Sequence, residues 1–269
     1  MFFEIFRFEC RYQLRSPLFL IVATVFFLLA FLITASESVS VGGVGNNLNL
    51  NASFAIIQVQ YVLTIIFGMF AGVAFVAGAI TRDYEDKTAE LLFSTGVAEG
   101  SYLFGRFAGG CVFAVLAVMA GLLGTLVGTF MPWLDPERIG EFSADPYLFS
   151  ILAVILPNMF VICALFFSVA ALTRSVMAAY LAALGFLVAF VVIANVTDQE
   201  FIEYVALAGP FGQVAFGEIT RYWTVFDRNF AVPEFAGTLL YNRLIWIGVG
   251  LVALTVTAAL YRFNLAPSR

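Results

Sequence analysis

Six long runs of apolar residues constrain this chain more than any other feature of its sequence. An apolar stretch of about 20 residues crosses a lipid bilayer as an α-helix, because a helix satisfies its own backbone hydrogen bonds there. Stretches that are charged or rich in Gly, Pro or Asn separate the runs, which cover residues 17–35, 54–80, 101–131, 147–172, 176–196 and 244–261. The sequence therefore predicts an all-α polytopic membrane protein, with six transmembrane helices in a single domain over residues 1–269.

The composition excludes a soluble enzyme. Of the 269 residues, 62% are hydrophobic and 12% are charged, whereas soluble domains are roughly half apolar and a quarter charged. No His occurs, which removes the usual metal ligand and the side chain that titrates near neutral pH. Cys10, Cys111 and Cys163 lie too far apart in the sequence for a CxxC metal or redox site. We expect no bound metal or cofactor, no enzymatic activity and, at a net charge of −5, no nucleic-acid partner.

The basic residues predict the orientation of the spans, because Lys and Arg are enriched in cytoplasmic loops. With both termini inside, only Arg138, Arg221, Arg228 and Arg243 of the 13 Lys and Arg residues lie outside. The sequence therefore predicts that both the N-terminus and the C-terminus are cytoplasmic, an N-in/C-in topology.

Residues 1–16 precede the first run and are amphipathic. Glu4, Arg7, Arg11 and Arg15 recur at helical spacing, and Phe and Leu side chains supply apolar surface. This pattern is typical of a helix that lies in the inner membrane interface, in contact with lipids. A frayed polar tail before the first span is the alternative.

Residues 81–100 form the inner loop between the second and third runs and contain the clearest candidate for a functional site. From Arg82 to Phe93 the loop has good helix formers and no Gly or Pro, and Gly96 is placed to end a helix. A short charged helix with an apolar tip is suited to docking into another protein, and a solvated connector is the alternative. The candidate docking residues are Glu85, Lys87, Thr88, Glu90, Leu91, Leu92 and Phe93.

The same loop resembles a segment of a known family. It reads EDKTAELLFST at residues 85–95 and is followed by YLFGR at residues 102–106, which is similar to the ExGTxExLLxxP…LxGK segment of ABC-2-type transporter permeases. Lys87 stands where that family commonly has Gly, and Gly96 stands where it commonly has Pro. The six spans and the amphipathic N-terminal segment are also similar to the family. The resemblance implies that residues 81–100 carry a coupling helix, which seats in a groove of a partner ATPase.

Four other segments resemble the N-terminal permease half of bacterial proteins that carry a second permease half and a zinc aminopeptidase domain on the same chain. They are MPWLDPER at 131–138, LPN at 156–158, LTRS at 172–175 and TRYWT at 220–224. The sequence has no HExxH motif, so the chain is either a stand-alone permease or a fragment of such a protein, without the peptidase. The resemblance implies a multi-pass protein of a bacterial-type cytoplasmic (inner) membrane.

These features predict the membrane-spanning permease subunit of an ATP-driven ABC exporter. The sole lysine, Lys87, follows Asp86, so the phosphate-binding motif GxxxxGK[ST] is absent. ATP and Mg²⁺ are therefore expected on a separate ABC ATPase subunit. The resemblance implies a second permease, as a homodimer or a related chain. The alternatives are an ATP-independent channel or secondary carrier, and a membrane scaffold. Ion-coupled carriers usually place ionisable residues within spans, yet the six runs lack Asp and Glu.

Polar residues outside the inner loop supply two further candidate sites. Asn158 lies near the middle of the fourth run, where it either lines a transport pathway or hydrogen-bonds to another helix. Residues 197–243 form a long outer segment before the sixth span, and the resemblance implies that helices there close the outer mouth. Glu218 and Arg221 are spaced to pair on one helix face, and with Trp223 they are the candidate outer gate. An anchor at the membrane interface is the alternative role for this segment.

Overall fold

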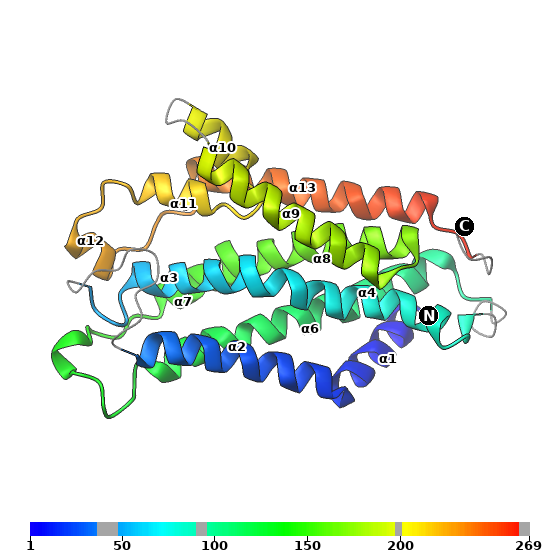
Figure 1. Ribbon diagram of the computed structural model, residues 1–269, viewed down its shortest axis with the longest axis horizontal. Coiled ribbons are helices and arrows are strands. Elements are labelled where there is room, and N and C mark those ends of the chain that lie inside the picture. The colour runs from blue at the N-terminus through cyan, green and yellow to red at the C-terminus, as the bar shows by residue number, and fades with distance from the viewer. Residues whose placement is uncertain (37–47, 90–95, 197–200, 264–269) are drawn as a thin grey trace.

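The computed structural model describes residues 1–36, 48–89, 96–196 and 201–263. Six helices in this part of the chain are long and apolar enough to cross a membrane, which confirms the predicted number. Most of them run along the long axis of the molecule, while α9 is inclined to it (Figure 1). The six are α2 (Pro17–Ala35), the continuous helix α3–η1–α4 (Ser53–Glu85), α6 (Glu99–Gly128), the continuous helix α7–η3–α8 (Asp145–Thr173), α9 (Val176–Val196) and α13 (Gly237–Leu260).

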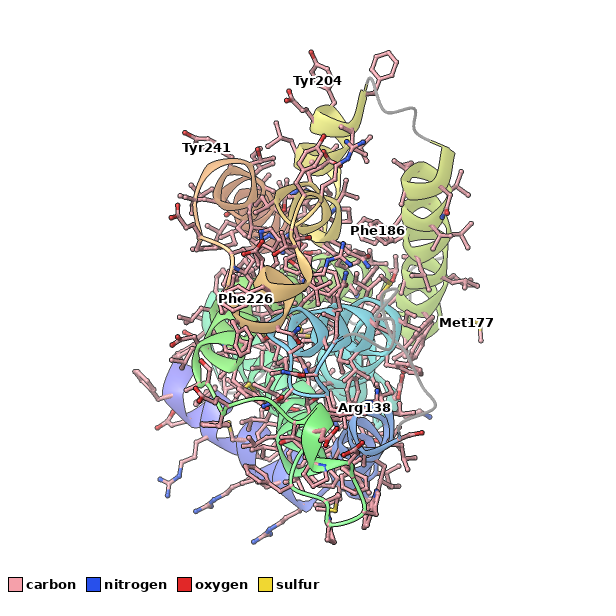
Figure 2. The ribbon with its side chains drawn as sticks, turned by 90° about the vertical axis from the view of Figure 1, so that its left-hand side faces the viewer. Arg138, Met177, Phe186, Tyr204, Phe226 and Tyr241 are labelled. Atoms are coloured by element: carbon pink, nitrogen blue, oxygen red, sulfur yellow. The ribbon has the colours of Figure 1, made fainter. Side chains whose placement is uncertain are left out.

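The second and fourth of these helices form the centre of the bundle. They are the most buried of the six, whereas α2, α9 and α13 expose most of their apolar side chains. Figure 2, viewed along the bundle, shows α9 at one side, with Phe186 directed toward the other helices and Met177 directed away. Such an exposed apolar surface is compatible with contact with lipid.

Both central helices contain a π-helical turn. In the second helix, η1 (Leu63–Gly68) separates α3 (Ser53–Val62) from α4 (Met69–Glu85), and in the fourth, η3 (Ser150–Ile155) separates α7 (Asp145–Phe149) from α8 (Leu156–Thr173). Pro157 follows η3 closely. Because proline lacks an N–H group and its ring clashes with the carbonyl four residues earlier, the wider π-helical turn accommodates it without ending the helix.

The two central helices approach each other closely at Gly72 of α4. A Cβ atom at this position would lie 2.6 Å from Cγ2 of Ile162 in α8. A Cβ atom at Gly68, one turn earlier, would lie 3.2 Å from Sδ of Met159. The GxxxG spacing of these glycines therefore serves contact between helices of the same chain.

Five short helices complete the described structure. They are α1 (Phe2–Arg15), η2 (Pro136–Arg138), α10 (Ile202–Ala208), α11 (Gln213–Ile219) and α12 (Val225–Phe230). The N-terminus and the last described residue, Phe263, lie at one end of the bundle, where α4 ends and α6 begins, and α12 lies at the opposite end (Figure 1). The N-terminus, Phe263 and the described ends of the 81–100 loop thus share one end of the molecule.

Helix α13 begins at Gly237, earlier than the expected start of the sixth span at residue 244. The expectation treated Arg243 as a charge outside the apolar run, within the outer segment 197–243. Arg243 instead lies inside the helix and is 1% exposed, because polar groups of neighbouring elements surround its guanidinium group. The second helix likewise extends past the expected end at residue 80, as far as Glu85.

Candidate functional site

Four charged side chains form a buried cluster where α1, α4 and α6 meet. They are Glu9, Arg82, Asp83 and Arg106, here called the ion-pair cluster. Arg106 donates from Nη1 to Oε2 of Glu9 and from Nη2 to Oδ2 of Asp83, both at 2.5 Å. Arg82 donates from Nη2 to Oε1 of Glu9 at 2.9 Å. Two positive charges thus balance two negative ones, which offsets the high cost of burying them.

Neighbouring polar groups complete the hydrogen bonds of the two carboxylates. Tyr102 donates its hydroxyl to Oδ2 of Asp83 at 2.7 Å, and Gln13 donates from Nε2 to Oε1 of Glu9 at 2.9 Å. Glu9 is fully buried and Arg106 is 3% exposed. Nη1 of Arg82 and Nε of Arg106 are buried without a hydrogen-bond partner in the described structure, so the charges and the bonds to the carboxylates hold these elements together.

Two glycines of α6 allow α1 to reach the ion-pair cluster. A Cβ atom at Gly109 would lie 2.5 Å from Cγ of Glu9, and one at Gly105 would lie 2.8 Å from Cγ2 of Ile5. Helix α1 therefore lies directly on the backbone of α6, with Glu9 against Gly109. A larger residue at either glycine would push α1 away from the bundle.

The chain turns immediately after α4, at the start of the 81–100 loop. Helix α4 ends at Glu85, and the backbone N–H of Thr88 donates to the carbonyl of Asp83 at 2.9 Å. Lys87 has φ 56°, in the left-handed region that Gly adopts readily. Of the helix expected between Arg82 and Phe93, the described residues contain the end of α4 and this turn, and residues 90–93 lie outside the described structure. The turn also explains why a glycine suits the position of Lys87.

The structure places the candidate docking residues at this end of the bundle as far as it describes them. Glu85, Lys87 and Thr88 are exposed, so they are available to another protein. Gly96 has φ 72°, a conformation that proline cannot adopt. The remaining candidates lie outside the described residues; they are Glu90, Leu91, Leu92 and Phe93.

A second buried polar cluster lies between the candidate spans α8 and α13. It consists of Asn158, Asn242 and Arg243, here called the Arg243 cluster. Arg243 donates from Nη1 to Oδ1 of Asn158 at 2.5 Å and from Nε to Oδ1 of Asn242 at 3.0 Å. It also donates from Nη2 to Oδ1 of Asn242 and, at 3.4 Å, to the carbonyl of Pro210. The sequence suggested an interhelical hydrogen bond as one role of Asn158, and the structure shows one.

The Arg243 cluster binds the chain segment between α10 and α11. Asn242 donates from Nδ2 to the carbonyls of Ala206 and Gly209, both at 2.7 Å. Gly212 has φ 68° and lies against the guanidinium group of Arg243, where any side chain would collide with it. These contacts fasten the outer segment to α13 and, through Asn158, to α8.

Arg243 is a buried charge whose hydrogen-bond partners are all uncharged. All three acceptors of its hydrogen bonds are neutral oxygens, and within the described part of the chain no carboxylate forms an ion pair with it. A buried charge with neutral partners is expensive within a membrane and marks a functional position by default. Asn158, Asn242 and Arg243 are each at most 1% exposed.

The candidate gate residues of the outer segment lie elsewhere. Arg221 Nη1 and Glu218 Oε2 are 3.6 Å apart on the surface, as their spacing predicts, and Trp223 packs partly buried against the core. Among the described residues, no hydrogen bond joins these three to the Arg243 cluster. Exposed pairs of this kind contribute little to stability.

Sequence reasoning missed both buried clusters. The signal for the first was Arg106, a charge inside an apolar run, which requires a buried partner. The signal for the second was the dipeptide Asn242–Arg243 next to an apolar run that lacks acidic residues. The partners, Glu9 and Asn158, lie far away in the sequence. No group of His, Cys, Asp and Glu suited to a metal ion occurs in the described residues.

Comparison with known proteins gives one family. The sequence model of the family described as ABC-2 family transporter protein matches residues 3–264, nearly the whole chain. No curated protein matches the chain. Proteins of this family are membrane components of ABC transporters, and they work with an ABC ATPase. With its six apolar helices and this match, the chain belongs to the ABC-2 family of transporter proteins and is a multi-pass permease subunit of an ABC transporter.

Proposed function

We propose that the chain is the permease subunit of an ATP-driven exporter, and that the ion-pair cluster transmits the movement of the ATPase to the spans. One observation carries this proposal. Arg82 lies at the start of the coupling loop 81–100, and Arg106 lies shortly after its end. Both side chains donate hydrogen bonds to the carboxylate of Glu9. The loop is thus held at both ends by one buried group.

The ion-pair cluster makes α1, α4 and α6 move together. Breaking a buried ion pair by removing one partner costs about 3–5 kcal/mol, so a displacement of the loop moves its flanking helices more readily than it separates them. Closure of two ATPase subunits around ATP and Mg²⁺ would push the docking residues from Glu85 to Phe93. The force would then reach the second and third spans at the same time.

A continuous series of contacts leads from α4 to the opposite end of the bundle. Gly68, at the junction of η1 and α4, faces Met159 of α8, and the neighbouring Asn158 accepts a hydrogen bond from Arg243. We infer that movement of α4 loosens the Arg243 cluster and releases the α10–α11 segment. In this proposal the outer gate includes Arg243 and Asn158, with Glu218, Arg221 and Trp223 on its surface.

The proposal also sets the arrangement in the membrane. The end that holds the N-terminus, Phe263 and the ends of the 81–100 loop faces the cytoplasm, where the ATPase binds, so the topology is N-in/C-in in a bacterial-type inner membrane. A second permease, identical or related, supplies the other half of the pathway. ATP and Mg²⁺ bind to the ATPase subunits rather than to this chain.

The test distinguishes binding of the ATPase from transmission of its movement to the spans. The tagged protein is purified from its native membranes in mild detergent, its partners are identified by mass spectrometry, and ATP-driven transport is measured after reconstitution. We expect the wild type and Arg106→Gln to retain an ABC ATPase, and the Glu90→Arg, Leu92→Asp variant to lose it. Arg106→Gln should abolish the coupling of ATP hydrolysis to transport, while Arg106→Lys should preserve part of it.

Two results would contradict the proposal in different ways. If no ATPase accompanies the wild type, the chain acts as an ATP-independent channel, a carrier or a scaffold. If a folded Arg106→Gln variant couples normally, the ion-pair cluster does not transmit force. A proton-coupled carrier has the least support, because Arg243 is effectively always protonated and the buried carboxylates of Glu9 and Asp83 are already paired with arginines.

A further inference from the structure

We propose that the groove between α1 and the start of α2 binds the headgroup of an anionic phospholipid, with Arg11 and Arg15 holding the phosphate. The groove has a volume of about 400 Å³ and is lined by Phe8, Arg11, Tyr12, Arg15, Ser16 and Pro17. This inference goes beyond the proposed export function. It requires only that α2 crosses the membrane, whichever side carries the ATPase.

The two arginines are arranged to bind an anion. Arg11 and Arg15 are four residues apart in α1, so they lie on the same side of the helix one turn apart. Both are exposed, and neither forms an ion pair within the part of the chain that the structure describes. Arginine presents a planar fork of donors that matches the oxygens of a phosphate group. Their charge is therefore available to a ligand.

The groove also offers apolar surface next to this charge. Phe8 is 55% exposed and Tyr12 is 45% exposed, and both rings line the groove beside the arginines. A soluble anion such as free phosphate has no apolar part that could contact these rings. The combination of two cations and two aromatic rings fits an amphiphile, whose phosphate meets Arg11 and Arg15 and whose glycerol and first acyl carbons meet the rings.

The position of the groove brings it to the lipid headgroups. The extended backbone of Ser16 separates α1 from α2, and Pro17 begins α2 as its first residue. Because α2 is only 19 residues long and apolar throughout, its first turn lies close to the membrane surface. Helix α1 turns away from α2 at this point (Figure 1), so the groove opens at the depth of the phosphates.

Neighbouring charges favour this groove over a second one that also borders Tyr12. The second groove has a volume of about 300 Å³ and includes Glu85 and Asp86, which repel an anion. The guanidinium group of Arg82 covers the face of the Tyr12 ring at 3.5 Å and is already paired with Glu9. Arg11 and Arg15 are therefore the cations open to the headgroup.

Lipid binding to the full chain tests this inference. The protein is purified in detergent, titrated with phosphatidylglycerol or phosphatidylcholine, and analysed by native mass spectrometry, which gives the affinity for each bound lipid. Near an anionic headgroup each arginine is worth roughly a fivefold change in affinity, so we expect phosphatidylglycerol to bind tighter than phosphatidylcholine by about 25-fold. The variant Arg11→Gln, Arg15→Gln should lose this preference, and Arg11→Lys, Arg15→Lys should keep part of it.

Matched controls make the result specific to the groove. The variant Arg138→Gln, Arg221→Gln removes the same charge at the other end of the bundle and should bind phosphatidylglycerol as the wild type does. Excess inorganic phosphate should not displace the lipid, and a photoreactive phosphatidylglycerol should cross-link to residues 8–17. Displacement by free phosphate, cross-links elsewhere, or unchanged preference in the Arg11→Gln, Arg15→Gln variant would each overturn the inference. None of these readings depends on an ATPase partner.

Discussion

Glu9 and Arg106 lie 97 positions apart in the sequence and form an ion pair of 2.5 Å in which both side chains are almost completely buried. This contact makes residues 2–15 a docked helix instead of a frayed polar tail. It also places the carboxylate of Glu9 beside Arg82 and Arg106, which lie near the two ends of the 81–100 loop.

The ion-pair cluster should dominate the stability of this end of the bundle. Arg106→Met leaves the carboxylates of Glu9 and Asp83 buried without their main partner, and we expect a loss of about 3–5 kcal/mol in the free energy of unfolding. Denaturant unfolding in detergent measures this loss. The control is Arg262→Gln, which removes the exposed pair between Arg262 and Glu99 and should cost about 1 kcal/mol or less. Equal effects of the two substitutions would contradict the prediction.

The close approach of α1 to α6 predicts a steric effect at Gly109. In Gly109→Ala the new methyl group overlaps Cγ of Glu9, so α1 should detach and the protein should lose about 1–3 kcal/mol of stability. Protease digestion after α1 and thermal unfolding in detergent both report this change. Gly185→Ala is the control, because its Cβ meets open space within α9 and should stabilise that helix by about 0.5–1 kcal/mol. If the Gly109→Ala protein resists digestion as well as the wild type does, α1 does not depend on the close contact at Gly109.

The left-handed backbone of Lys87 predicts an improvement by glycine. Lys87→Gly removes the steric cost of a side chain at φ 56° and should stabilise the protein by about 1 kcal/mol. Lys87→Ala, which keeps that cost while removing the charge, should leave stability almost unchanged, and Lys87→Val should reduce it. Thermal unfolding of the four proteins in one detergent provides the comparison. If alanine stabilises as much as glycine, the lysine charge rather than the backbone is the cause.

The neutral partners of Arg243 predict opposite results for two substitutions at Asn158. Asn158→Leu removes the Oδ1 acceptor of Arg243 and should destabilise the protein by about 1–3 kcal/mol. Asn158→Asp supplies a carboxylate at the same place and should retain stability. It should nevertheless slow transport, because a stronger pair holds the proposed outer gate closed. The double variant Asn158→Leu, Arg243→Met should be more stable than Asn158→Leu alone, and a purely additive loss would argue against the direct contact.

The capping box of α12 predicts an effect of pH at the end of the bundle opposite the N-terminus. Hydrogen bonds from the Thr224 side chain and backbone lower the pKa of Asp227 below its ordinary value of 3.8, and the two residues form a capping box at the start of α12. Because the folded pKa is the lower one, this stabilisation is complete above the ordinary value and is lost as the pH falls through the folded pKa. Hydrogen exchange of α12 should therefore be faster in Asp227→Asn than in the wild type at neutral pH, and the difference should vanish in strong acid. A difference that persists in acid would show that the charge is not the cause.

Much of the fold could be predicted because apolar length is a local property. A run such as residues 17–35 cannot satisfy its backbone in lipid except as a helix, and α2 has those bounds. The end of a span is harder to predict where a charged residue adjoins the apolar run. Arg243 lies inside α13 because Asn158, which is distant in the sequence, accepts a hydrogen bond from it. The turn at Lys87 could not be predicted for a similar reason. Lysine favours a helix, but the chain turns there, and the N–H of Thr88 donates to the carbonyl of Asp83.

The sequence by itself determined the number of apolar helices and the family, because each is written in contiguous stretches of residues. Only the tertiary structure decided which charges meet. Packing of helices brings Glu9 to Arg106 and Asn158 to Arg243, and the first of these contacts depends on Gly109, where α1 lies against α6. A buried charge is stable only next to its partner, and no local pattern reveals a partner that is supplied by another helix.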